Sequence, residues 1–273
     1  LAYEAATADL NDVNMIDPFH LEAYNKIAIN YNRDVEIYPV LNALFEGIYG
    51  SNPYKSPTDM GVNMAGFAIV DDAVCQGASR MEILRRYYTG LVDRVKGKCD
   101  ECVVRKLEIV MQQAGVTPDI CPAVRASLDK AQATGAPAGA MVLPDGRVVT
   151  GKTSSLLGPS AAMLLNAVKL LAGIDKDLDL LPASIIAPIS DMKLRHLGHH
   201  NPRLHSDEVL IALSISAVTN PLAERVLKKL DDLRGSEAHF SVILSEEDAK
   251  LYKRLGIHVS CEPRYEVKKL YHK

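Results

Sequence analysis

The sequence predicts a mixed fold of class α+β or α/β, with a mainly helical subdomain at residues 1–135 followed by a three-layer α/β subdomain at residues 136–273. Two observations predict this division. In the first part, apolar residues recur at helical spacing, for example through residues 71–97. At Gly135-Ala136-Pro137 the pattern changes, and short apolar runs then flank a Pro144-Asp145-Gly146 turn, which is typical of a β-hairpin.

The individual elements follow from periodicity, capping residues and turn signals. Helices are expected at about 34–49, from the loop at 54–60 through 69, 71–97, 99–114, 118–134, 151–173, 183–197, 206–217, 221–234 and 245–256. Strands are expected at about 138–143, 147–150, 237–244 and 257–260. The first 135 residues therefore read as nearly all helix, and the strands gather in the second part.

Composition narrows the class of protein. The chain has 273 residues, 48% of them hydrophobic, with a net charge of −3, which argues against a broad surface for nucleic acid or membrane lipids. Five cysteines, an odd number, are typical of reduced thiols in the cytoplasm, and no apolar run approaches the roughly 18–20 residues of a membrane span. Because the sequence opens at Leu1 within an ordered-looking segment, we expect a domain fragment of a longer chain, and we expect it to form a homo-oligomer.

The segment from Gly146 to Thr153 matches the P-loop pattern G-x-x-x-x-G-K-[ST]. A P-loop must wrap phosphate with the backbone of a loop between a strand and a helix. Here the four intervening residues follow a hairpin turn and read as a β-strand. We therefore interpret the match as a hairpin. An anion site at the helix start near residues 153–155 stays open as a weaker alternative.

The same hairpin and the helix after it resemble the opening of cytidine-deaminase-like domains, in topology and without their zinc site. Zinc chemistry in those domains needs a His or Cys two residues before a Glu, and a distant P-C-x-x-C. The helix here offers Ala161-Ala162-Met163, and no P-C-x-x-C follows. No metal ligands are assigned, and the residues identify no cofactor.

Two further groups invite a metal or redox interpretation. Cys99 and Cys102 form a C-x-x-C without the second pair that a structural zinc needs, so half-buried positions at a helix start explain them better. His196, His199, His200 and His205 crowd a helix end and loop beside Asp207 and Glu208. Histidine near a helix carboxyl end is favoured by the helix dipole alone, which competes with a metal site there.

The strongest candidate site is a set of polar segments at residues 9–34 and 54–64. The catalytic candidates are Asp12, Asp17, His20, Arg33, Asp34, Lys55 and Asp59. The ligand-binding candidates are Asn14, Asn32, Arg33, Lys55, Ser56, Thr58 and Asn63. Arg33 and Lys55 suit an anionic group, whereas Asp12 or Asp59 suits hydroxyls or a metal ion. His20 suits proton transfer. The competing interpretation is that such segments supply caps and turns.

These segments also carry a family resemblance. The runs Tyr3–His20, Asn30–Glu36 and Tyr54–Gly66 resemble the bacterial family catalogued as domain of unknown function 1846, and the resemblance continues through Thr219-Asn220-Pro221 to the last strand. It implies a longer cytosolic protein, with this chain as a carboxy-terminal portion that lacks a P-loop-like domain with a Gly-Ser-Gly-Lys core. The family offers no activity to carry over. Some members are labelled ATP-dependent zinc proteases, but this sequence contains no H-E-x-x-H.

Two hypotheses about function follow. In the first, the chain is the substrate-side part of a cytosolic enzyme that uses a nucleotide or another phosphate-bearing ligand, with its site at the junction to the missing upstream domain of the same chain. In the second, it is a non-catalytic module for assembly or partner binding, because no complete catalytic constellation is present in the sequence. The first is favoured slightly, and the sequence does not decide whether the protein is an enzyme.

Overall fold

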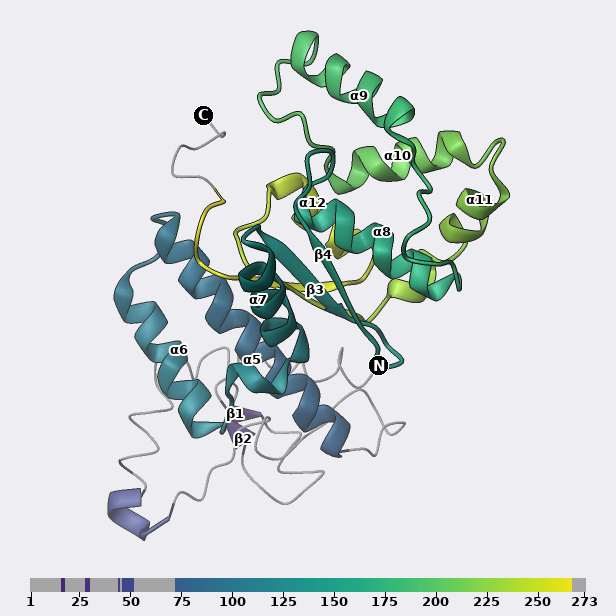
Figure 1. Ribbon diagram of the computed structural model, residues 1–273. Helices are drawn as coiled ribbons and strands as arrows, with labels where there is room; N and C mark the ends of the chain where they lie inside the picture. The colour runs from purple at the N-terminus through teal and green to yellow at the C-terminus, as the bar shows by residue number, and fades with distance from the viewer. Residues whose placement is uncertain (1–15, 18–27, 30–43, 45, 52–71, 267–273) are drawn as a thin grey trace. The chain divides into compact units, whose positions relative to one another are not determined.

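The chain divides into two compact units, Leu1–Ile120 and Cys121–Lys273, in a computed structural model (Figure 1). The structure describes residues 16–17, 28–29, 44, 46–51 and 72–266. The unit boundary falls earlier than the one drawn from composition at residue 135, because the helix of residues 122–134 packs on the sheet that follows it. Among the described helices, none is both long enough and apolar enough to cross a bilayer.

In the described part of the first unit, two long helices follow a short helical stretch at residues 44 and 46–49. Its elements are β1 (Ile16–Asp17), β2 (Ala28–Ile29), α5 (Asp72–Val95), α6 (Glu101–Gln113) and the 3-10 turn η2 (Pro118–Ile120). Helices α5 and α6 pack together and bury Leu84, Tyr88, Val104 and Leu107. A five-residue link at 96–100 makes the helices antiparallel neighbours. Both helices confirm the sequence prediction, whereas the short antiparallel pair of β1 and β2 was not anticipated.

The second unit is a sheet with helices on both faces. Its elements are α7 (Pro122–Thr134), β3 (Ala138–Val142), β4 (Val148–Lys152), α8 (Pro159–Leu171), α9 (Ala183–Arg195), α10 (Ser206–Ser216), α11 (Pro221–Leu227), η3 (Asp231–Leu233), β5 (Glu237–Phe240), α12 (Glu246–Arg254) and β6 (His258–Cys261). The strand order is β4-β3-β5-β6. Strand β3 runs antiparallel to β4 and β5, while β5 and β6 are parallel. This mixed sheet confirms the α/β prediction.

Side-chain alternation decides which helix covers which face of the sheet. On one face Met141, Val149 and Phe240 join the main apolar core with Met163 of α8. On the other face Ala138 and Ala140 are fully buried beneath α7, which packs on β3, β4 and β5. Because neighbouring strand residues point to opposite faces, the small alanines leave room for α7 while the larger side chains fill the α8 layer. The cytidine-deaminase-like topology stays a prediction.

The P-loop-like segment is a β-hairpin. Met141 pairs with Val149 and Gly139 with Gly151 in an antiparallel ladder, so three of the four residues between the two glycines of the motif belong to β4. Gly146 has φ +83° in the turn, a conformation that favours glycine. Gly151 lies against the backbone of α8, where a Cβ would come within 2.2 Å of Met163 N. The turn and the packing on α8 therefore explain why glycine occupies both positions, and the hairpin interpretation is confirmed.

Several predicted helices are shorter than expected, for local reasons. The predicted helix at 118–134 is divided, because Pro122 begins α7 after the separate turn η2. Helix α8 begins at Pro159 and not at Gly151, since β4 runs to Lys152 and a loop intervenes. Proline at the first helical position lacks only an N–H that would have no helical partner, so it marks these starts. Helix α11 ends at Leu227 and is followed by η3.

Candidate functional site at the carboxyl ends of β5 and β6

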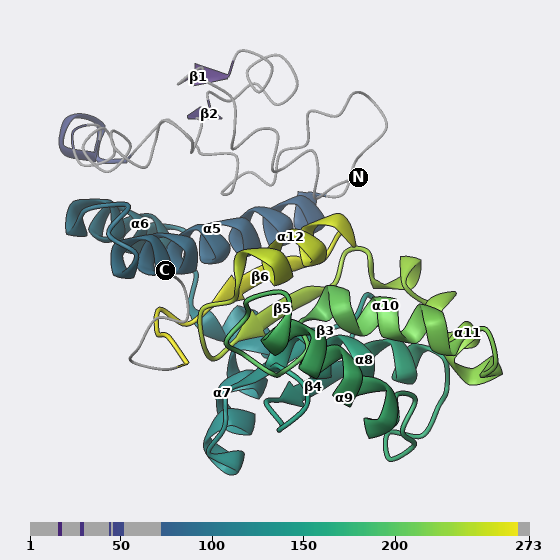
Figure 2. The same cartoon turned by 90° about the horizontal axis from the view of Figure 1, so that it is seen from above.

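The parallel pair β5 and β6 defines the best place to look for a ligand site. In open α/β sheets, ligands bind beyond the carboxyl ends of the strands, where the chain leaves the sheet. Here the segment after β6 lies beside the segment after β5. Glu262 N donates to Phe240 O at 2.8 Å, and Ile243 N donates to Arg264 O at 2.8 Å. Figure 2 shows β5 and β6 side by side with α12 over β6.

A pocket of about 580 Å³ opens at this edge of the sheet. Three segments of the second unit form its wall: the end of α7, the turn into β3, and the chain beyond β5 and β6. The lining residues are Leu128, Ala131, Gln132, Gly135, Ala136, Pro137, Val242, Arg264, Tyr265 and Glu266. The volume falls within the range of small-molecule pockets, roughly 300–1,000 Å³. The pocket therefore has the size and the place in the sheet of a ligand site.

Arg264 is the positively charged group of the pocket. Its Nε donates to Ser241 O at 2.5 Å, while Ser241 Oγ accepts the backbone N–H of Ala138 at 2.9 Å. The guanidinium is thus anchored through one nitrogen to the end of β5. Within the described part of the chain, no carboxylate forms an ion pair with Arg264, and the neighbouring Glu266 pairs with Arg203 at 2.5 Å. The two terminal nitrogens of Arg264 remain for a ligand.

Another wall of the pocket, the carboxyl end of α7, carries partial charge of the sign opposite to that of Arg264. Helix α7 ends at Thr134, and Gly135 follows in a left-handed conformation. The last carbonyls of a helix carry partial negative charge and lack helical partners, so they accept hydrogen bonds from ligand hydroxyl or amino groups. Gln132 adds an amide that both donates and accepts. The pocket therefore suits a ligand with an anionic group at one end and hydrogen-bond donors at the other.

A buried network of capping contacts holds α10 and α12 together beside this edge. Asp248 Oδ1 accepts the backbone N–H of Ser206 at 2.9 Å, and Oδ2 lies 3.2 Å from His205 Nδ1. The hydroxyl of Ser245 donates to the same carboxylate at 3.0 Å. Ser206 Oγ is buried without a partner of normal hydrogen-bond geometry, although it lies near Asp248 and Tyr252. One carboxylate thus joins the starts of two helices.

The pKa of Asp248 is lowered to about 2 from an ordinary 3.8. Burial, the largest influence, raises the pKa, but hydrogen bonds from His205 and Ser206 together outweigh it. The pKa of His205 is raised, first by its hydrogen bond with Asp248 and against the effect of burial. In mildly acidic solution Asp248 is therefore negatively charged and His205 positively charged.

A second buried contact fixes α9 to α10. Lys193 is 1% exposed, and its Nζ donates to Glu208 Oε2 at 2.6 Å and to Arg203 O at 2.7 Å. The same oxygen of Glu208 accepts the backbone N–H of His205 at 2.8 Å. Because Arg203 also pairs with Glu266, this contact reaches the segment that lines the pocket.

We expect acid to destabilise the protein through Asp248. A carboxyl with a folded pKa of about 2 and an unfolded pKa near 3.8 contributes about 2 kcal/mol above pH 4, and this contribution is lost as the pH falls from 4 to 2. His205, with its raised pKa, contributes fully below pH 6.5 and loses its contribution at higher pH. Urea denaturation at pH 3, 4 and 6 measures the first trend, and denaturation at pH 6, 8 and 9 measures the second.

The matched variants for this measurement are Asp248→Asn and Asp177→Asn, the second at an exposed carboxylate. Asp248→Asn should lower the unfolding free energy at pH 6 by about 2 kcal/mol and flatten its fall below pH 4. Asp177→Asn should leave the wild-type profile in place. A profile of Asp248→Asn that still falls as steeply as the wild type below pH 4 would contradict this role of the carboxylate.

Most residues of the sequence-predicted site lie outside the described residues. These are Asp12, Asn14, His20, Asn32, Arg33, Asp34, Lys55, Ser56, Thr58, Asp59 and Asn63. Asp17 is described in β1, where it pairs with Ala28. The site predicted at 9–34 and 54–64 therefore stays a prediction.

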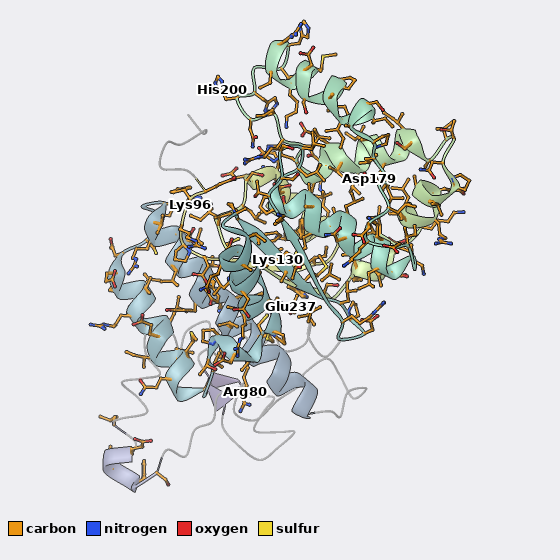
Figure 3. The ribbon with its side chains drawn as sticks, viewed as in Figure 1. Arg80, Lys96, Lys130, Asp179, His200 and Glu237 are labelled. Atoms are coloured by element: carbon orange, nitrogen blue, oxygen red, sulfur yellow. The ribbon has the colours of Figure 1, made fainter. Side chains whose placement is uncertain are left out.

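The histidine and cysteine groups have structural explanations in the described region. His205 caps α10 and contacts Asp248, whereas His196, His199 and His200 are exposed, with His200 on the loop between α9 and α10 (Figure 3). Cys99 is half-buried as expected, donates to Gly90 O at 3.4 Å and has a pKa raised mainly by burial, whereas Cys102 is exposed and its half-buried assignment was wrong. Across the described residues, no three His, Cys, Asp or Glu side chains are arranged to hold a metal ion.

The sequence reasoning missed Arg264 and the pocket. The available signal was position: Arg264 follows the strand predicted at 257–260, and polar residues just beyond such strands line ligand sites. The capping box beginning at Ser245 was predicted, and Ser245 Oγ accepts the backbone N–H of Asp248 at 3.1 Å. What the local pattern did not reveal is that Asp248 also caps α10, which lies 42 residues earlier in the chain.

Known proteins match the chain along its whole length. The family model described as domain of unknown function DUF1846, N-terminal, matches residues 1–115, and the model of the C-terminal domain matches residues 119–271. UPF0371 protein stu1377 of Streptococcus thermophilus is 54% identical over 273 residues, all of this chain and 55% of that protein. UPF0371 proteins SpyM50764 and SpyM3_1021 of Streptococcus pyogenes have the same identity and coverage.

The chain spans about half the length of the curated relatives it matches. The amino-terminal family model covers residues 1–115, so the chain contains sequence from both family domains. The expectation of a carboxy-terminal portion alone is corrected on this point.

Proposed function

Because the chain belongs to the family described as domain of unknown function DUF1846, we propose its function from the geometry of the site: the pocket beside Arg264 binds a small phosphate-bearing ligand, as the substrate-side part of a cytoplasmic enzyme. The observation that carries this proposal is the guanidinium of Arg264, an exposed residue of the pocket lining, whose Nε is anchored to Ser241 O while its two terminal nitrogens are not used by that bond. Arginine presents such nitrogens to phosphate or carboxylate as a paired donor.

The wall formed by the carboxyl end of α7 limits the chemical class of the ligand. Helix α7 supplies its carbonyl end, which favours hydroxyl or amino donors on the ligand and disfavours a second anionic group there. A sugar phosphate or a nucleoside monophosphate has both features, with one anionic end and several hydroxyls. The polar residues of the amino-terminal segments, Arg33 and Lys55 among them, stay a separate proposal for an anion-binding site, because they lie outside the described residues.

The test uses the 273-residue chain and three probes: inorganic phosphate, ribose 5-phosphate and AMP. A probe at a hundredfold its dissociation constant should stabilise the wild type by about 2.7 kcal/mol, and isothermal titration should give the affinity. Arg264→Gln should remove binding, and Arg264→Lys, which retains the charge but not the paired donors, should weaken it. Arg254→Gln, at an exposed position of α12, is the matched control and should bind as the wild type does.

The outcomes separate the alternatives. Ribose 5-phosphate or AMP binding better than inorganic phosphate would support the contribution of α7. Equal affinity of wild type and Arg264→Gln for every probe, or no binding of any probe at millimolar concentration, would contradict the proposed site.

A further inference from the structure

Exposed apolar side chains concentrate on one part of the second unit. Among the described residues, fourteen large hydrophobic side chains are exposed, and six of them lie within residues 192–218. These six are Met192, Leu194, Leu197, Ile211, Ile215 and Val218. Scattered apolar residues are normal on a protein surface, whereas apolar residues gathered on one helix face mark an interaction surface. Figure 1 shows α9 and α10, which carry most of this sequence cluster.

Helix α10 carries the clearest part of this cluster. Ile211, Ile215 and Val218 are 60%, 63% and 84% exposed, and their spacing of four and three residues places them on one side of the helix and the turn that follows it. The opposite side, with Val209, Ala212 and Leu213, is buried in the core. A helix that is apolar on both sides is normally covered on both sides. We name the exposed row Ile211, Ile215 and Val218 the α10 stripe.

The charges around the α10 stripe favour one arrangement of a partner. Asp207 and Glu208 occupy the first turn of α10, and its last turn has no basic residue. Helix α11, which packs on α10 just beyond that end, carries exposed Arg225. Glu208 is already paired with Lys193, so Asp207 is the acidic group that remains at the surface. Negative charge at one end and positive charge beyond the other match an identical surface turned through 180°.

We propose that a second copy of this chain covers the α10 stripe, with the two α10 helices packed antiparallel about a two-fold axis. This arrangement places Asp207 of each copy near Arg225 of the other and opposes the two helix dipoles. A parallel arrangement would bring the acidic ends together. The contact is centred on one helix of eleven residues from each copy, so its area lies at the low end of specific interfaces, below about 1,200 Å². The dimer is accordingly concentration-dependent.

Sedimentation equilibrium of the 273-residue chain, from about 1 to 200 μM, tests the proposal. The wild type should pass from monomer to dimer within this range, as expected for a small interface. Ile215→Glu should weaken the dimer by about 100-fold, because two carboxylates would be buried near the axis without partners. Val148→Glu, at an apolar position that is 45% exposed on β4, is the matched control and should not change the dissociation constant.

Exchanging the charges of Asp207 and Arg225 tests whether the two α10 helices are antiparallel. Both residues are exposed, so these variants leave the apolar core unchanged. Asp207→Arg should weaken the dimer, and the double variant Asp207→Arg with Arg225→Asp should restore it. Circular dichroism of each variant confirms that it is folded. A wild type that stays monomeric throughout, or a dimer that Ile215→Glu leaves intact, would overturn the proposal. Failure of the double variant to recover the dimer would overturn the antiparallel arrangement.

Discussion

Replacing Gly151 with alanine is expected to destabilise the second unit by about 3 kcal/mol or more. The added Cβ would lie 2.2 Å from Met163 N and 2.4 Å from Met163 Cα, where no real Cβ fits. These are backbone atoms of α8, so relief requires α8 to move away from the sheet. Such movement would open the apolar core that Met163 and Val149 share. Urea denaturation at neutral pH measures the loss.

Gly158→Ala is the matched control for this prediction. Gly158 precedes α8, its φ is −68°, and its added Cβ would have no neighbour closer than 3.7 Å. Alanine there should cost about 1 kcal/mol or less, through the weaker N-cap. The pair also separates the hairpin from a phosphate loop. A phosphate loop would lose ligand affinity on Gly151→Ala with little loss of stability, and an unchanged unfolding free energy would contradict the packing argument.

Replacing Lys193 with methionine is expected to cost about 3 kcal/mol. Methionine keeps most of the buried volume but removes the donor to Glu208 Oε2 and to Arg203 O. Breaking one side of a buried ion pair costs more than the pair contributes, because the remaining charge stays buried without its partner. Glu208 retains the backbone N–H of His205, which limits the loss. Chemical denaturation gives the magnitude.

A double-variant cycle isolates the contact between Lys193 and Glu208. Lys193→Met combined with Glu208→Gln removes both charges and should recover part of the stability, with a coupling energy of about 1–3 kcal/mol. Arg195→Met, on the same helix, is the control, because Arg195 pairs with Asp191 at the surface and should contribute well under 1 kcal/mol. If Lys193→Met cost no more than Arg195→Met, the buried contact would not stabilise the fold as proposed.

The sequence predicted the elements that depend on neighbouring residues. The Asp145-Gly146 turn predicted the hairpin because the turn conformation is local, and Asp145 also accepts the backbone N–H of Arg147 at 3.0 Å. Ser245 predicted the start of α12 for the same reason. The unit boundary was placed later than in the structure because α7 has an ordinary helical pattern, and nothing in it reveals that it packs on β3.

The candidate site depends on contacts between distant parts of the chain, and these were not predictable. Lys193 precedes Leu194 and Arg195 in a segment that reads as a surface helix, yet its side chain is buried against Glu208. Arg264 meets Ser241 across 23 residues, and Arg203 meets Glu266 across 63. A single sequence gives no measure of such proximity. The histidine cluster was singled out for a metal site or for the helix dipole alone, whereas His205 contacts Asp248, which belongs to another helix.

The order of strands in the second unit has a consequence for how the protein is made. Strand β3 pairs with β5, and Ala138 N donates to Ser241 Oγ, 103 residues later in the chain. A ribosome adds about 5–20 residues per second, so the β3–β4 hairpin leaves it roughly 5 to 20 s before its second partner strand exists. During that interval one edge of β3, with Ala140 and Met141, has open backbone hydrogen-bonding groups. We expect this nascent hairpin to need a chaperone more than any other part of the second unit, and slower synthesis to increase that need.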